Sequence, residues 1–154
     1  MTRSRSVAWM LGALALGSAF PSRALAALGG DAESIAVDSA TLGGTRRVAR
    51  AAGWEEHELQ LPSGTVVREY LQGGRVFALA WAGPVVPDLR RLLGPYFEPY
   101  VNSPRDPRSG HHRRFVATPD WAVQSAGHQG AFLGRAWLPA HLPTGFDLDR
   151  VRAR

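Results

Sequence analysis

The sequence predicts a small α+β domain built on an antiparallel sheet or a partly open barrel, with two three-stranded meanders flanking one short helix. Three observations predict this fold. Short segments show strand-like alternation or apolar runs, turns rich in Gly and Pro separate them, and one stretch carries apolar residues at helical spacing. The 154-residue chain has no cysteine. Burial of apolar surface must therefore hold the fold without disulfides.

The first twenty-six residues predict an export signal. Arg3 and Arg5 precede an uncharged, mostly apolar run from Val7 to Phe20. Ala24-Leu25-Ala26 then supplies the small-x-small pattern of a signal-peptidase site. The run of fourteen residues is shorter than the about 20 that a membrane-spanning helix needs. We expect cleavage after Ala26 on the general secretion route, and a periplasmic or secreted mature protein without a membrane anchor.

Loss of the signal changes the charge of the chain. The formal net charge of +5 falls to +2, because three of the eighteen basic residues leave and all thirteen acids stay. No basic stripe with interleaved aromatic residues is present, so we expect no nucleic-acid partner. All eighteen basic residues are arginine, which leaves no lysine for covalent catalysis. No cofactor is expected.

The sequence divides the mature chain into two parts. Residues 27–53 show a weak pattern and are expected to form an N-terminal arm or a short helix. Residues 54–154 are expected to form a single α+β domain, because 128 mature residues suffice for one core.

The first predicted meander has an apolar third strand. Its strands are expected over residues 56–61, 65–71 and 75–82. In the third strand, Phe77, Leu79 and Trp81 form a face of large residues, whereas the alternate positions from Val76 to Ala82 form a small one. Such a strand is typical of the centre of a sheet with a layer packed on each face.

A short helix and a second meander follow. Pro87 and Asp88 mark the start of the helix and Gly94-Pro95 its stop, with one further helical turn possible up to Tyr100. Strands are expected over residues 113–117, 121–126 and 131–138, with a hairpin turn at Gly127–Gly130.

Three blocks of this sequence resemble a known family. They are LPSGTVVREY (residues 61–70), RVFALAWAGPVVPDLRRLLGPYF (residues 75–97) and SAGHQGAFLGRAWLP (residues 125–139). Together they are similar to the domain of unknown function 2844, a family of small exported proteobacterial proteins. The resemblance covers residues 54 to 143 and implies a single exported domain. It implies no activity, so no catalytic or binding residue is carried over.

Catalytic and metal sites have little support in the sequence. Ser125 and His128 lie three residues apart near a predicted turn and are the candidates for a small hydrolase. The chain has neither a Gly-x-Ser-x-Gly elbow nor the HExxH or cysteine patterns of zinc sites, so no metal is expected.

A polar ligand has candidate contacts in Arg68, Glu69, Tyr70 and Arg135. The alternative is that these residues form cross-strand pairs on a solvated face, for instance between Glu69 and Arg135. Aromatic residues are also candidates for a sugar- or peptide-binding surface, against the alternative that they fill the core. They are Trp54, Tyr70, Phe77, Trp81, Tyr96, Trp121 and Trp137.

The leading functional hypothesis is a non-enzymatic exported protein that binds an unknown protein or envelope partner, as an accessory of the envelope or of secretion. A small hydrolase using Ser125 and His128, and a binder of a sugar or peptide, are the alternatives.

Overall fold

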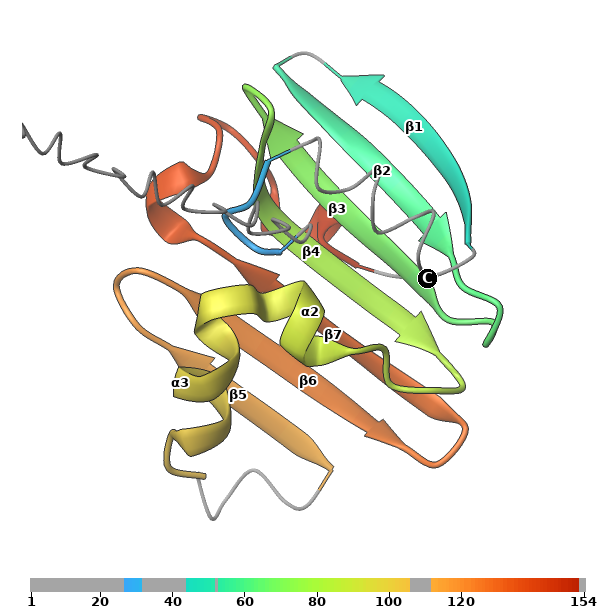
Figure 1. Ribbon diagram of the computed structural model, residues 1–154. Coiled ribbons are helices and arrows are strands. Elements are labelled where there is room, and N and C mark those ends of the chain that lie inside the picture. The colour runs from blue at the N-terminus through green and yellow to red at the C-terminus, as the bar shows by residue number, and fades with distance from the viewer. Residues whose placement is uncertain (1–26, 32–43, 52, 106–111, 153–154) are drawn as a thin grey trace, which may run out of the picture.

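The computed structural model describes residues 27–31, 44–51, 53–105 and 112–152. The predicted signal, residues 1–26, lies outside them. Seven strands in these ranges form one open antiparallel sheet with the order β1-β2-β3-β4-β7-β6-β5 (Figure 1). The strands are β1 (Thr45–Ala51), β2 (Trp54–Gln60), β3 (Val66–Gln72), β4 (Arg75–Gly83), β5 (Arg113–Ala117), β6 (Ala122–His128) and β7 (Ala131–Trp137).

Both predicted meanders are confirmed. The first is β2-β3-β4 and the second is β5-β6-β7, and antiparallel pairing of β4 with β7 joins them at the centre of the sheet. The helical segment between them spans α2 (Leu89–Leu93), the 3-10 turn η1 (Gly94–Tyr96) and α3 (Phe97–Asn102). Within the described residues, no helix has the length and apolar character needed to cross a membrane.

The helical segment begins and turns where the sequence predicts. Asp88 caps α2, since its Oδ1 accepts a hydrogen bond from the Arg91 amide at 3.2 Å. Gly94 ends α2 with a φ of 53°, a conformation that favours glycine. The chain then continues into η1 and α3, which lie with α2 in front of the sheet in Figure 1.

The first apolar core lies between one face of the sheet and the helical segment. We call this the helix face. Leu79 and Trp81 of β4 pack there with Leu93 of α2 and Tyr100 of α3. Leu28 joins the same core from a short segment, Ala27–Asp31, that lies next to α2 and β4.

The second core lies on the opposite sheet face, which we call the tail face. Two 3-10 turns, η3 (Pro139–His141) and η4 (Leu148–Arg150), belong to the C-terminal segment that covers it. Phe146 and Val151 from this segment pack around Tyr70, Phe77 and the small alanines of β4. The ring of Phe146 meets that of Phe77 edge-on at 4.9 Å.

A bulge changes one predicted face of β4. Tyr70 pairs with Ala78, whereas Leu71 pairs with Val76, so Phe77 has no partner in β3. The sequence placed Phe77 with Leu79 and Trp81. The extra residue instead turns the Phe77 ring toward Tyr70 and the tail-face core, 6.4 Å from the Tyr70 ring.

Strand β1 lies in the range that the sequence assigned to an arm or short helix. It pairs with β2 along its whole length, and its side chains are exposed. Three arginines among its seven residues leave no apolar face, so alternation does not reveal it as an edge strand. Residues 32–43 of that range lie outside the described residues.

The second hairpin is tighter than the sequence predicts. Gly127 and His128 belong to β6, and only Gln129 and Gly130 form the turn. A glycine is required at position 127 because the backbone of Ala131 lies too close for a side chain. A Cβ at Gly127 would lie 2.6 Å from the carbonyl oxygen of Ala131.

Substitution of Gly134 by Ala tests the packing of the centre of the sheet. A Cβ at this position would overlap the Trp81 ring, which is buried. We expect Gly134→Ala to lower the free energy of unfolding by about 1–3 kcal/mol, the usual cost of overpacking. Urea unfolding measures this. Ala131→Ser, at an exposed position of the same strand, should change stability by less than about 0.5 kcal/mol, and equal effects of the two variants would contradict the packing argument.

Candidate functional site

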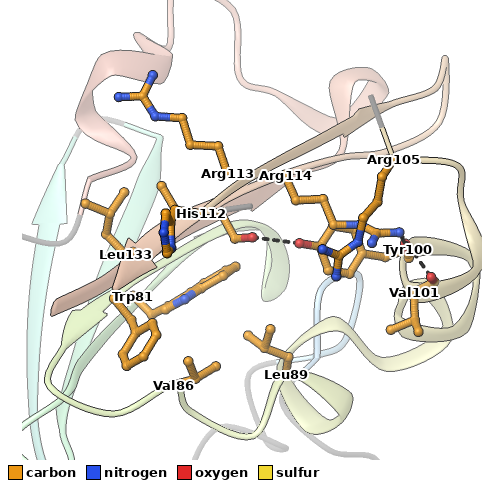
Figure 2. A pocket seen from close by; sticks show the side chains of 14 residues that line it. Trp81, Val86, Leu89, Tyr100, Val101, Arg105, His112, Arg113, Arg114 and Leu133 are labelled. Atoms are coloured by element: carbon orange, nitrogen blue, oxygen red, sulfur yellow. Dashed lines mark hydrogen bonds between the residues drawn. The ribbon is translucent and has the colours of Figure 1, made fainter. Parts of the chain in front are cut away.

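A hollow of about 380 Å³ lies on the helix face between the helical segment and strands β5 to β7. In Figure 2, Trp81 and Leu133 border one side of it, Tyr100 and Arg114 border the other, and Val86 and Leu89 are at the lower edge. Its volume falls within the range of about 300–1,000 Å³ typical of small-molecule sites.

Two hydroxyl groups meet at the wall of the hollow. The Tyr100 hydroxyl of α3 lies 2.7 Å from Oγ of Ser125 in β6, and either oxygen can donate the hydrogen. Tyr100 is buried, so this bond ties α3 to the sheet as well as placing polar atoms beside Trp81.

Arg114 fixes the end of α3 against β5. Its Nη2 donates hydrogen bonds to the carbonyls of Tyr100, Val101 and Ser103 at 2.6, 3.0 and 2.7 Å. Its guanidinium also lies 4.9 Å from the centre of the Tyr100 ring. A cation at the C-terminal carbonyls of a helix is electrostatically favourable, so Arg114 holds one wall of the hollow in place.

The charged side chains at the hollow are basic. Arg105, His112 and Arg114 line it, Arg113 borders it with its guanidinium directed away from it in Figure 2, and none of the described residues that line it is acidic. Its apolar lining includes Trp81, Val86, Leu89, Phe132 and Leu133. The arrangement suits a molecule with an apolar body and a negatively charged group.

Ser125 and His128 are separated by the structure. Both lie in β6, where residues three apart point to opposite faces of the sheet. Ser125 bonds to Tyr100 on the helix face, whereas Nδ1 of the exposed His128 lies 3.1 Å from the carbonyl oxygen of Gln129. The hydroxyl and the imidazole therefore do not face each other.

The structure brings together three of the four predicted polar-ligand residues, and their partner is the C-terminal segment. Arg68 donates to the carbonyl of Arg152 at 2.8 Å, and the Tyr70 hydroxyl donates to that of Arg150 at 2.8 Å. Arg135 donates to the carbonyl of Leu148 at 3.2 Å. Alternate carbonyls of one segment are thus held by side chains from β3 and β7.

Acidic residues and an amide complete these contacts. Arg68 also bonds to Glu58 through Nη2 at 2.6 Å and approaches Glu56 at 3.2 Å. Nε of Arg135 donates to Gln124 at 2.9 Å. Glu69 is buried on the helix face, where it pairs in register with His57 and Leu79, so the sheet separates it from Arg135.

The family match extends over most of the chain. Residues 24–151 match the family described as Protein of unknown function (DUF2844). The chain belongs to this family. Comparison with curated proteins and with solved structures found no match. The family region begins three residues before Ala27 and ends at Val151, so it includes the hollow and both segments that cover the sheet.

All seven aromatic candidates belong to one of the two cores or pack against one. Tyr70, Phe77, Trp81 and Trp121 are buried. Trp54, Tyr96 and Trp137 are partly buried and pack against a core. Sequence reasoning missed Tyr100 and Arg114, although two signals pointed to them. Tyr100 follows Phe97 at helical spacing. Arg114 belongs to an adjacent pair of arginines on a predicted strand, and one residue of such a pair faces the covered side of the sheet.

His57 is the buried member of a chain of polar contacts with exposed residues of β1 and β2. Nη2 of Arg46 lies 2.9 Å from Nδ1 of His57, and because a guanidinium only donates, Nδ1 accepts. Nε2 then carries the hydrogen and donates to Glu55 at 3.2 Å, while Glu55 accepts from Nε of Arg50 at 3.2 Å. Burial lowers the pKa of His57 below its usual value. Among the described residues, no three His, Asp or Glu side chains gather for a metal ion.

The pKa of Tyr70 predicts a loss of stability in alkali. Burial raises it from 10 to about 12, so the unfolded chain releases this proton first and the folded state loses stability as pH rises from 10 through 12. Two pKa units correspond to about 2–3 kcal/mol. Urea unfolding between pH 9 and 12 should show the loss, and Tyr70→Phe should remove it while costing about 1 kcal/mol at pH 7 for the missing hydrogen bond. Tyr96→Phe should retain it.

The pKa of His57 predicts a loss of stability in weak acid. Because this pKa is lowered in the folded protein, the unfolded chain takes up the proton first, and stability falls as pH decreases below about 6.5. The slope is at most about 1.4 kcal/mol per pH unit for one proton. His57→Gln should flatten the dependence measured by urea unfolding between pH 7.5 and 5, whereas substitution of the exposed His128 by Gln should not. An unchanged slope in His57→Gln would show that another group is responsible.

Proposed function

We propose that this protein is an exported, non-enzymatic binding protein that takes a small amphipathic anion into the hollow beside Trp81 and Tyr100. Export, with a cut after Ala26 and release to the periplasm or beyond, is supported by the basic start, the apolar run and the Ala-x-Ala pattern. The family region begins close to that cut, at residue 24.

One observation carries the choice of ligand: an apolar hollow whose described charged lining residues are all basic. The exposed Val86 and the partly buried Leu89 offer contact surface to a hydrocarbon or ring system, and burial of that surface provides the favourable free energy. Arg105 and Arg114 attract a carboxylate, sulfate or phosphate group on the same molecule. The Tyr100 and Ser125 hydroxyls are further hydrogen-bonding partners.

The geometry favours binding over hydrolysis. A serine nucleophile needs a base within hydrogen-bond reach, and Ser125 bonds instead to the Tyr100 hydroxyl while His128 lies on the other sheet face. Ser125 is therefore assigned to the wall of a binding site.

A protein or envelope partner is a second candidate, favoured by one sheet edge. Among the described residues β5 pairs only with β6, which leaves its outer edge open to another strand. Phe115 in this strand is 57% exposed, and an exposed aromatic side chain at an open edge is a common contact for a partner.

A matched pair of substitutions tests the ligand proposal. Val86 lies at the edge of the hollow and is 42% exposed, whereas Val48 in β1 is 45% exposed and lies outside it. Sodium dodecanoate, titrated by calorimetry, should bind the natural protein more tightly than its uncharged methyl ester. Val86→Glu should weaken dodecanoate binding by about threefold to tenfold through charge repulsion, and Val48→Glu should leave it unchanged.

Two outcomes would contradict the proposal. One is an absence of dodecanoate binding to the natural protein. The other is an equal loss of affinity in Val86→Glu and Val48→Glu. That result would show that affinity depends on the overall charge of the protein and not on the hollow. Unfolding midpoints of both variants, compared with the natural protein, control for damage to the fold.

A further inference from the structure

The segment Ala27–Asp31 directly follows the predicted signal cut and is built into the folded domain. The Leu28 amide donates to the carbonyl of Leu92 in α2, and the Gly29 amide donates to that of Val76 in β4, both at 2.9 Å. The Val76 amide in turn donates to the Gly30 carbonyl at 2.9 Å. The segment is thus bound on one side to the helical layer and on the other to the central strand.

Its first two residues are buried. Ala27 is 8% exposed and Leu28 is 1% exposed, with Leu28 in the helix-face core beside Leu93. A Cβ at Gly94 would lie 2.6 Å from Cβ of Ala27, so α2 ends in a glycine where Ala27 packs against it. Both residues nearest the cut on its C-terminal side are therefore inside the fold.

We propose that the signal must be cut before the domain folds, because docking of Ala27 and Leu28 holds the chain on the C-terminal side of the cut inside the fold. Hydrolysis adds one water across the Ala26–Ala27 peptide bond and leaves a carboxylate on Ala26 and an amine on Ala27. A peptidase needs this stretch of backbone free, and a docked segment is cleaved only through the small population in which it is open. The inference rests on the proposed export, since it concerns the same cut.

The contacts of Leu28 are the physical reason why cleavage has to precede folding. To present Ala27 to a peptidase, the chain must withdraw the Leu28 side chain from the core and break its hydrogen bond to Leu92. Each tenfold reduction in the open population slows cleavage tenfold when opening is fast. We expect the folded precursor to be cut at least tenfold more slowly than a precursor whose site is free.

The test compares two full-length precursors. One has the natural sequence, and the other carries a ten-residue Gly/Ser linker between Ala27 and Leu28, which keeps the cleavage pattern with Ala27 after it and the docking contacts of Leu28, but frees Ala27 from the fold. Each is treated with purified signal peptidase in a non-ionic detergent, and product is followed by mass spectrometry. Near-ultraviolet circular dichroism in the same detergent reports whether each precursor is folded.

Slow cleavage of the folded natural precursor, with rapid cleavage of the folded linker variant, supports the proposal. A natural precursor that shows the folded signal only after it is cut also supports it, since the cut then precedes folding. A folded natural precursor that is cut as fast as the linker variant overturns the proposal and leaves export standing. Resistance of both precursors, including in urea-pretreated form, overturns the export signal itself.

Discussion

The burial of β4 on both faces is the constraint on which the rest of the structure depends. Its residues from Val76 to Trp81 are all buried, so the sheet needs a covering layer on each side. The helical segment with Leu28 supplies one layer, and the C-terminal segment with Phe146 and Val151 supplies the other. The polar contacts of Arg68, Tyr70 and Arg135 secure the second layer, because they satisfy backbone carbonyls that lie against the sheet.

The parts that sequence predicts well are those where one face is apolar and turns are marked by glycine or proline. Both meanders and the helical segment meet that condition. Strand β1 does not, because an exposed edge strand rich in arginine has no face to bury. The position of Phe77 was also beyond prediction, since a bulge depends on how β3 and β4 pair and not on the composition of either strand.

The candidate site shows a different limit. Single residues such as Ser125 and Arg135 were identifiable as polar groups on strands, but their partners come from segments distant in sequence. Ser125 meets Tyr100, and Arg135 meets Leu148. A basic hollow arises because α3 ends over β5 and Arg114 binds its final carbonyls, a juxtaposition set by tertiary packing alone. The spacing of apolar and polar residues within one element does not indicate contacts between distant elements.

Each of the two layers that cover the sheet includes a residue from a different end of the described chain. Leu28 and Val151 are more than a hundred residues apart in sequence, yet each completes one core against the same few strands. Contacts of such long range raise the entropic cost of loop closure and slow folding. A chain that emerges from its N-terminus onward cannot close the tail-face core until its last residues are available. The architecture therefore delays completion of the tail-face core until Val151 is present.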